Sequence, residues 1–201
     1  FMAAAVKIAA FGALGRVVAI AIGGLGGSWA PGIALVAGFT MVIGNLGALA
    51  QTDLKRLLAF SSVAHAGYML SGIVGMAVSS TVAQAQSLEA LLFYVATYAV
   101  TNLGAFGILI AIRRSGKEPS LTTDVTGLAK RNPVLAAMLT ILLISLTGVP
   151  ISVGFVGKFH LFKAAVGAGY AGLAAVGVLM SAVSAFYYLR LVVLMYMEEP
   201  V

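Results

Sequence analysis

Residues 147–163 read TGVPISVGFVGKFHLFK and follow an uncharged apolar run, VLAAMLTILLISL, at residues 134–146. The segments before and after the interruption are roughly 15 residues each, or about 22 Å of helix, which is short of the ~30 Å hydrocarbon core of a bilayer. Two short apolar helices around glycine and proline are typical of a discontinuous transmembrane helix. We therefore predict one interrupted crossing over residues 133–166. The residues that interrupt it are Gly148, Pro150, Gly154 and Gly157.

The alternative for residues 133–166 is two thin crossings. In that arrangement Glu198 and Glu199 would lie on the opposite side of the membrane.

The composition indicates a membrane protein throughout. Of the 201 residues, 61% are hydrophobic and 9% are charged, and the mean hydropathy is +1.07. A soluble domain carries about a quarter charged residues. Five further runs have about the 20 residues that a transmembrane helix needs: residues 1–22, 31–50, 57–78, 88–112 and 170–196. We predict one all-α domain over residues 1–201, a polytopic transmembrane helix bundle with about six crossings and one discontinuous helix.

The basic residues predict the orientation. Seven of them fall in two connections, residues 52–56 and 113–131, and none falls in the first or third connection between helices. The seven are Lys55, Arg56, Arg113, Arg114, Lys117, Lys130 and Arg131. Because cytoplasmic loops are enriched in lysine and arginine, we expect these two connections to face the cytoplasm, with the plasma membrane as the default location. The net charge of +6 needs no nucleic acid to explain it.

Several kinds of chemistry are excluded or unsupported by the sequence. There are no cysteines, which excludes disulfides and thiolate-held iron–sulfur or zinc sites. The two histidines are 95 residues apart without a carboxylate cluster, which does not match metal-ligand spacing. No glycine-rich nucleotide loop follows a strand. No signal peptide is evident, and the opening FMAAAVKIAAFGAL suggests a cut into a longer protein.

Two lysines lie inside apolar segments, where charges are costly and usually functional. Lys158 follows the break at Gly148 by about ten residues, and Lys7 lies among small residues that allow close helix packing. Because burial disfavours the charged form of an amine, a buried lysine can exchange a proton near neutral pH. Both are candidates for a proton relay. The simpler alternative is that they reach to the membrane surface, for which Lys163 is better placed than Lys158.

The helix predicted over residues 88–112 carries Tyr94, Tyr98 and Asn102 at a spacing of four. This spacing places the three on one face, where they could bind water between the two lysines; ordinary hydrogen bonding between helices is the alternative. Glu89 is predicted to open this helix, where the positive end of the helix dipole favours a carboxylate.

His65 shares a predicted helix face with Ser61 and Tyr68. It could take part in a relay, although a lone histidine is more often a hydrogen-bonded packing residue. His160 is two residues from Lys158 and should point elsewhere on the helix, which makes it a weak candidate.

The motifs QTDLKRLLAFSSVAHAGYML, FYVATYAVTNLGAFG, GVPISVGFVGKFHLF and SAFYYLRLVVLMYMEEP resemble the antiporter-like membrane subunits of respiratory complex I. The resemblance covers essentially the whole chain and is greatest to the subunit N family of NADH:quinone oxidoreductase. Sister subunits M usually have a glutamate at the position of Lys158. The family has fourteen transmembrane helices, and the resemblance implies that this chain holds helices eight to thirteen.

The resemblance also implies roles for the candidates. Lys7 falls at the lysine of family helix eight and Lys158 at the lysine of the broken helix twelve. The polar residues of segment 88–112 fall on helix eleven, where sister subunits often carry histidine or lysine, so water carriage is expected there rather than direct protonation. NAD, FMN, iron–sulfur clusters and quinone would be bound by partner subunits, with no cofactor in this chain.

The expected function is proton translocation by a complex I subunit, coupled to quinone reduction elsewhere in the enzyme. The expected partners are other membrane-arm subunits, the lipid bilayer, protons and internal water, with no nucleic acid. A subunit of a multi-subunit cation/proton antiporter shares the same lysines and is the first alternative. A purely structural bundle of the membrane arm is the second.

Overall fold

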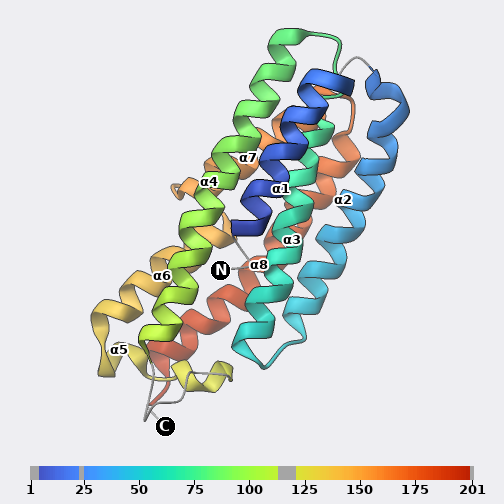
Figure 1. The fold of residues 1–201 in the computed structure, drawn as a ribbon. Helices are drawn as coiled ribbons and strands as arrows, with labels where there is room; N and C mark the ends of the chain where they lie inside the picture. The colour runs from blue at the N-terminus through green and yellow to red at the C-terminus, as the bar shows by residue number, and fades with distance from the viewer. Residues whose placement is uncertain (1–4, 23–24, 113–120, 200–201) are drawn as a thin grey trace.

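The computed structural model describes residues 5–22, 25–112 and 121–199, and these are almost entirely helical (Figure 1). Within these described ranges, five helical spans are long and apolar enough to cross a membrane: Ala5–Ile22, Gly26–Leu49, Leu54–Val74, Thr81–Ala111 and Ala171–Met197. The first comprises α1 (Ala5–Val17) and a π-helical turn η1 (Val18–Ile22), and the others are α2, α3, α4 and α8. The only β pairing in the described residues is an isolated bridge between Asp53 and Leu121. The predicted all-α membrane bundle is confirmed.

Two shorter helices, α6 (Pro133–Thr147) and α7 (Val153–Gly167), form the sixth crossing. They follow one another from one end of the bundle to the other (Figure 1). The start of α6 lies beside the end of α8, because Lys130 and Glu199 form an ion pair at 2.5 Å. The end of α7 lies beside the turn after α3, since Gly75, Val78 and Gly167 line one pocket. The pair therefore crosses the bundle once, and the alternative of two thin crossings is wrong.

Local signals explain the break between α6 and α7. Gly148 ends α6 in the left-handed conformation, with φ of 80°, and its N–H donates to the carbonyls of Ile144 and Ser145. This is the usual glycine termination of a helix. Ser152 begins α7 by accepting the N–H of Phe155 at 3.2 Å, a serine N-cap. Pro150 lies exposed between the two caps.

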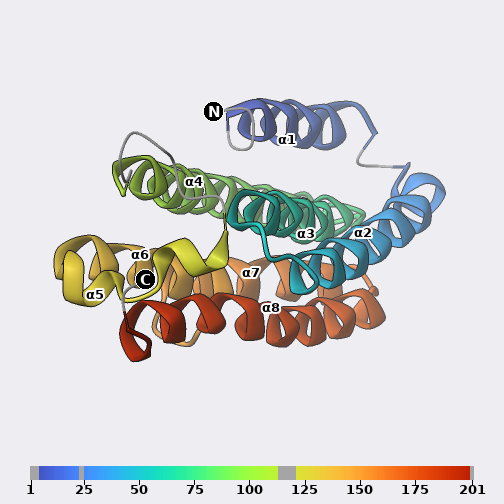
Figure 2. The ribbon, with the colours of Figure 1, turned by 90° about the horizontal axis from the view of Figure 1, so that it is seen from below.

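The helices are arranged in layers around α3. Figure 2 shows α1 on one outer side, α6, α7 and α8 on the other, and α3 and α4 between them. Helices α2 and α3 pack closely through glycines. A Cβ added at Gly67 would lie 2.7 Å from the Cγ of Met41, and one at Gly44 would lie 2.8 Å from the Cα of Ala64. Small residues of this kind let helix backbones approach one another in a membrane.

Two predicted helix starts are wrong. Helix α2 begins at Gly26 and includes Pro31, which was expected to open it; a proline near a helix start removes a single hydrogen bond there. Helix α4 begins at Thr81 after an N-cap by Ser80, seven residues before the predicted start. Glu89 therefore lies two turns inside α4 and does not open it. The polar side chains near the start of α4 are typical of a loop sequence, but in the structure they lie within the helix.

The two basic connections lie at the same end of the bundle. The N–H of Thr122 donates to the carbonyl of Thr52 at 2.9 Å, which ties the connection before α3 to the 3-10 turn η3 (Thr122–Val125) and the short helix α5 (Leu128–Arg131). Arg131 donates to the carbonyls of Asp124 and Thr126. Arg113, Arg114 and Lys117 lie outside the described residues.

Candidate functional site

Lys158 is buried at the break, with 3% of its surface exposed. Its Nζ donates to the carbonyl of Thr147 at 2.8 Å and to that of Leu146 at 3.2 Å. The last carbonyls of a helix have no partner within the helix and carry the negative end of its dipole. Gly148 takes the two carbonyls before these, so Lys158 takes the remaining two. The break in the helix and the lysine thus form one unit.

The rest of the Lys158 pocket is aromatic and tightly packed. Its Nζ lies 4.6 Å from the centroid of the Tyr68 ring, a favourable position for an ammonium group. A Cβ on Gly148 would lie 3.0 Å from the Cδ of Lys158. No carboxylate forms an ion pair with Lys158 in the part of the chain that the structure describes. The positive form is therefore stabilised by carbonyls and a ring rather than by a counter-charge.

Gly154 and Gly157 were predicted as part of the break, but they lie inside α7. A Cβ on Gly154 would overlap the carbonyl oxygen of Ser145, and one on Gly157 would lie 2.7 Å from the ring of Tyr94. Their function is close packing of α7 against α6 and α4. Of the four predicted residues, only Gly148 and Pro150 lie in the break itself.

Lys7 lies on α1 and is half-buried. Its Nζ donates to the hydroxyl of Ser62 at 2.6 Å and also to the carbonyl of the same residue. This contact joins the outer helix α1 to the central helix α3. The position of Lys7 therefore depends on how α1 docks onto α3.

His65 lies on α3 between the two lysines and is buried. Its Nδ1 is 2.7 Å from the hydroxyl of Tyr94, and its Nε2 is 3.4 Å from the hydroxyl of Tyr188. Ser62, His65 and Tyr68 follow one another at intervals of three, so they lie along one side of α3. Ser62 holds Lys7 and Tyr68 lies under Lys158, which places His65 midway along a polar line between the lysines.

Tyr94, Tyr98 and Asn102 are all buried on one face of α4, as their spacing predicts. The ring of Tyr98 lies 5.0 Å from that of His65. Next to them is a cavity of about 10 Å³, about the size that a single water molecule requires. Its lining includes His65, Tyr98 and, at the end of α6, Leu146. The cavity therefore reaches from the histidine to the helix end that holds Lys158.

Sequence reasoning missed part of this network. Asn45 of α2 donates to the hydroxyl of Tyr68 at 3.1 Å and accepts from that of Tyr187 at 3.0 Å. The signal was present, since Asn45 and the pair Tyr187 and Tyr188 are polar groups within apolar helices. Ser61, which was expected to share the face of His65, is buried and donates to the carbonyl of Leu58 in its own helix.

His160 does not belong to this group. It is exposed, and its Nδ1 donates to the carbonyl of Val156 at 2.7 Å. The sequence-based expectation that it points away from Lys158 is therefore confirmed.

Comparison of the sequence with known protein families identifies the family to which this chain belongs. The family model described as NADH:quinone oxidoreductase/Mrp antiporter, TM, matches residues 1–184. The chain belongs to this family of antiporter-like membrane proteins, and the sequence-based resemblance is confirmed.

Curated relatives identify a narrower group. The chain is 43% identical over 200 residues to NADH-quinone oxidoreductase subunit N 3 of Streptomyces griseus, covering 100% of this chain and 35% of that protein. It is 43% identical over 194 residues to subunit N 2 of Roseiflexus castenholzii, covering 96% of this chain and 39% of that protein. The chain thus spans less than half the length of these relatives.

Solved structures share the fold. A chain of respiratory complex I from Thermus thermophilus with bound aureothin matches with a TM-score of 0.71 at 35% identity, over 85% of this chain and 37% of that one. A chain of the Mrp complex from Dietzia matches with a TM-score of 0.79 at 30% identity, over 96% and 35% of the two chains. The arrangement of helices is therefore common to complex I and Mrp complexes.

Proposed function

We propose that this chain is one transmembrane unit of a proton-translocating subunit N of NADH:quinone oxidoreductase. The observation that carries the proposal is Lys158, buried at a helix break and connected to Lys7 by the polar side of α3. The names of the 43% identical relatives support this choice of enzyme. NAD, FMN, iron–sulfur clusters and quinone would be bound by partner subunits of the membrane and peripheral arms, and this chain would translocate protons.

The proposed route follows the contacts. Lys7 gives up a proton toward Ser62, and His65, Tyr94 and Tyr98 line the water-sized cavity on the way to Lys158. Asn102 is buried on the same face of α4, one turn beyond Tyr98. Lys158 holds the proton with two carbonyls of α6 and releases it when that geometry changes. A lysine is suited to this step because its amine can lose and regain a proton, whereas a guanidinium stays protonated.

The test of this proposal replaces Lys158 in the full-length subunit within its assembled complex. Lys158→Met keeps the length of the side chain and removes the titratable group, and we expect proton pumping to fall by about two orders of magnitude. Lys158→Arg should fail as well. The measurements are pumping and quinone reduction in vesicles with matched amounts of complex. Lys130→Met, which removes an exposed amine at one end of the bundle, is the control.

The outcomes separate a relay from a structural role. Near-normal pumping in Lys158→Met, or full rescue by arginine, would show that no proton is exchanged at Lys158. Either result would favour the structural bundle of the membrane arm, in which the amine of Lys158 serves only to cap the end of α6.

A cation/proton antiporter subunit is the second candidate, because the Dietzia Mrp complex matches this chain over 96% of its length. Sodium transport distinguishes the two. A complex I subunit should support proton uptake driven by NADH oxidation without a sodium requirement. Sodium extrusion driven by a proton gradient, without NADH oxidation, would favour the antiporter.

We also propose that the end carrying Lys55, Arg56, Lys130 and Arg131 faces the cytoplasm of a cell bounded by a plasma membrane, as the distribution of basic residues suggests. Because the chain has no cysteine, single cysteines can report on each end. Thr123→Cys and Ser79→Cys place exposed thiols at opposite ends of the bundle. An impermeant reagent should label them from opposite sides of the membrane, with Ser79→Cys outside. Reversed labelling would overturn the orientation.

A further inference from the structure

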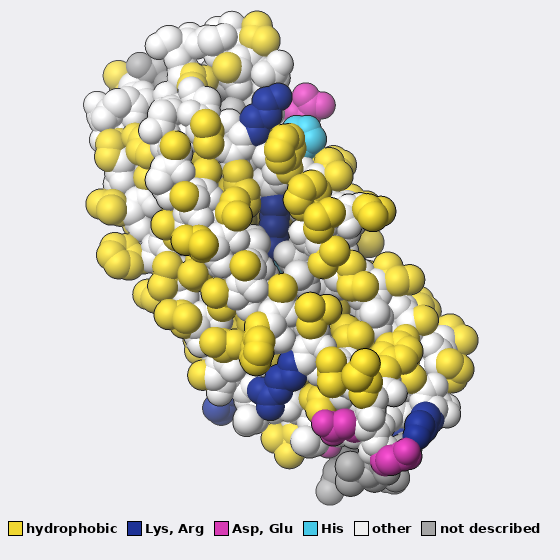
Figure 3. All heavy atoms as spheres, turned by 180° about the vertical axis from the view of Figure 1, so that it is seen from behind, with side chains coloured by type: hydrophobic (Ala, Val, Ile, Leu, Met, Phe, Trp, Pro, Cys, Tyr) yellow, Lys and Arg dark blue, Asp and Glu magenta, His cyan; other side chains and the backbone are white. Residues whose placement is uncertain are grey.

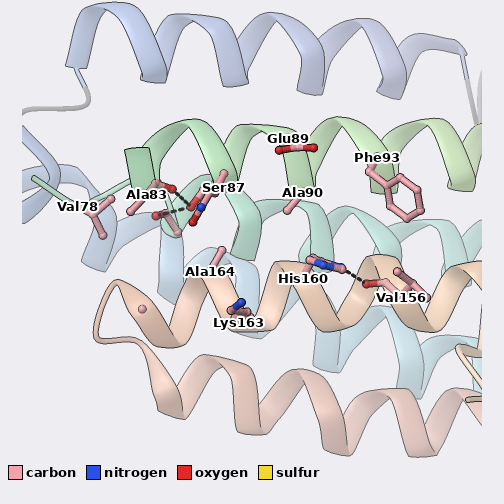
Figure 4. Close-up of a pocket in the computed structure, with 13 residues that line it drawn as sticks. Val78, Ala83, Ser87, Glu89, Ala90, Phe93, Val156, His160, Lys163 and Ala164 are labelled. Atoms are coloured by element: carbon pink, nitrogen blue, oxygen red, sulfur yellow. Dashed lines mark hydrogen bonds between the residues drawn. The ribbon is translucent and has the colours of Figure 1, made fainter. Parts of the chain in front are cut away.

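A pocket of about 490 Å³ lies outside the lysine network, between the first half of α4 and α7. Charged and apolar side chains share its walls. Glu89 and Phe93 come from α4, and Val156, His160 and Lys163 come from α7. Figure 4 shows Ala90, Phe93 and His160 where the two helices face one another, with Glu89 at the edge of α4 farther from α7.

The length of α4 indicates the depth of this pocket in the membrane. Its 31 residues span roughly 46 Å, so a centred α4 extends about 8 Å beyond each side of the ~30 Å core. Glu89 lies eight residues after Thr81, about 12 Å along the helix, and so near the boundary of the core. Phe93 lies one turn deeper. The pocket therefore has its charges near the membrane surface and apolar walls below them.

The two charges in the pocket are exposed and opposite in sign, yet no ion pair joins Glu89 to Lys163 in the residues that the structure describes. His160 donates its Nδ1–H to Val156, which leaves its Nε2 for another partner. Ser87, in contrast, is committed to the carbonyls of Gly75 and Ala83. The pocket thus offers one positive and one negative group to a molecule that lies between them.

The surrounding surface is suited to lipid. Figure 3 shows hydrophobic side chains over most of one face of the molecule, with basic side chains in separate spots. Exposed apolar residues of α7 next to the pocket include Phe155, Val156, Phe159 and Val166. Acyl chains can pack on such a surface, whereas an apolar protein helix would cover Glu89 and Lys163 without giving either charge a partner.

We propose that this pocket binds the headgroup of a zwitterionic phospholipid with a primary amine. Lys163 pairs with the phosphate, and Glu89 accepts hydrogen bonds from the ammonium group. The acyl chains continue along Phe93 and Val156. A lipid with a phosphate and no amine leaves Glu89 unpaired, and a quaternary ammonium cannot donate a hydrogen bond to it. The pocket therefore selects ethanolamine headgroups over glycerol and choline headgroups.

The experiment uses the full-length subunit in its complex, in nanodiscs that contain a photoactivatable phosphatidylethanolamine, phosphatidylglycerol or phosphatidylcholine. Mass spectrometry maps the labelled peptides. We expect phosphatidylethanolamine to label the peptides containing Phe93 and Val156 in preference to the other two lipids. Lys163→Gln and Glu89→Gln should each lower this labelling about fivefold, the upper range for a partly exposed ion pair.

A matched pair of variants controls for nonspecific effects of charge. Lys130→Gln and Glu199→Gln remove an exposed ion pair at the other end of the bundle and should leave labelling at the pocket unchanged. Glu89→Gln should also raise labelling by phosphatidylglycerol, because it removes the repulsion of an anionic lipid.

Two results would overturn the proposal. Equal labelling of the pocket by all three lipids would show an ordinary lipid-facing surface without headgroup selection. A photoreactive amino acid at Gln86, which also lines the pocket, should crosslink to lipid; a crosslink to another subunit would show that a protein covers the pocket instead.

Discussion

Lys158 and Lys7 are both held by backbone carbonyls, but by different parts of the fold. Lys158 takes the two free carbonyls at the end of α6, in a buried pocket between helices. Lys7 is half-buried and bonds to one residue, Ser62, through a contact between an outer helix and α3. The site of Lys158 is therefore built from backbone geometry, whereas that of Lys7 depends on one side chain and on the docking of α1.

This difference predicts which changes do most damage. Near Lys158, substitutions that move the backbone should be severe, because the carbonyls that hold the amine belong to a helix end. Near Lys7, the loss of a hydroxyl leaves the carbonyl of the same residue in place, so the effect should be moderate.

The largest effect is expected from Gly154→Ala. The new Cβ overlaps the carbonyl oxygen of Ser145, so α7 must move away from α6 and the helix end that holds Lys158. Overpacking of this kind costs about 3 kcal/mol at its upper range, and we expect little assembled complex on native gels and a strongly lowered melting temperature.

Gly12→Ala on α1 is the matched control for Gly154→Ala. A Cβ there meets nothing within 4 Å, and alanine is a better helix former than glycine by about 1 kcal/mol. We expect stability equal to or slightly above that of the wild type. If both substitutions had the same effect, α6 and α7 would not be packed as closely as the structure shows.

An intermediate effect is expected from Ser62→Ala. It removes the 2.6 Å hydrogen bond to Lys7 and leaves the carbonyl contact. A hydrogen bond of this kind contributes about 1 kcal/mol net, so we expect proton pumping to fall about fivefold with assembly unchanged. Ser184→Ala removes a hydroxyl that donates to its own helix and should have no effect on pumping. Equal loss in both variants would show that Ser62 matters only for packing.

The sequence predicted the Lys158 site better than the Lys7 site for a physical reason. Gly148 and Pro150 break an apolar helix within about ten residues of Lys158, so the signal is local and can be read along the chain. The partner of Lys7 is 55 residues away on another helix, and no local pattern distinguishes Ser62 from Ser61. Which serine faces α1 is decided by how the two helices pack.

The same reasoning explains the errors in α4. Its face of Tyr94, Tyr98 and Asn102 follows from helical spacing alone. The start of α4 cannot be predicted in this way, because glutamines and serines before Leu88 lower the hydropathy without ending the helix. The cap by Ser80 sets the start, and a serine cap is hard to recognise among several serines.

The smallest effect is expected from Tyr188→Phe, and comparison with Tyr94→Phe tests which side of His65 matters more. The Tyr94 hydroxyl lies 2.7 Å from Nδ1, whereas the Tyr188 hydroxyl lies 3.4 Å from Nε2, at the long limit of a hydrogen bond. Loss of a short bond to a buried group costs about 1–3 kcal/mol, and loss of the long one should cost less. We expect Tyr188→Phe to change proton pumping and thermal stability little, and Tyr94→Phe to lower both clearly. Both substitutions keep the ring, so packing is matched.

A larger loss of pumping in Tyr188→Phe than in Tyr94→Phe would mean that protons reach His65 through Nε2 and α8 rather than through Nδ1 and α4. The proposed route from Lys7 to Lys158 would then have to be redrawn along the opposite face of α3.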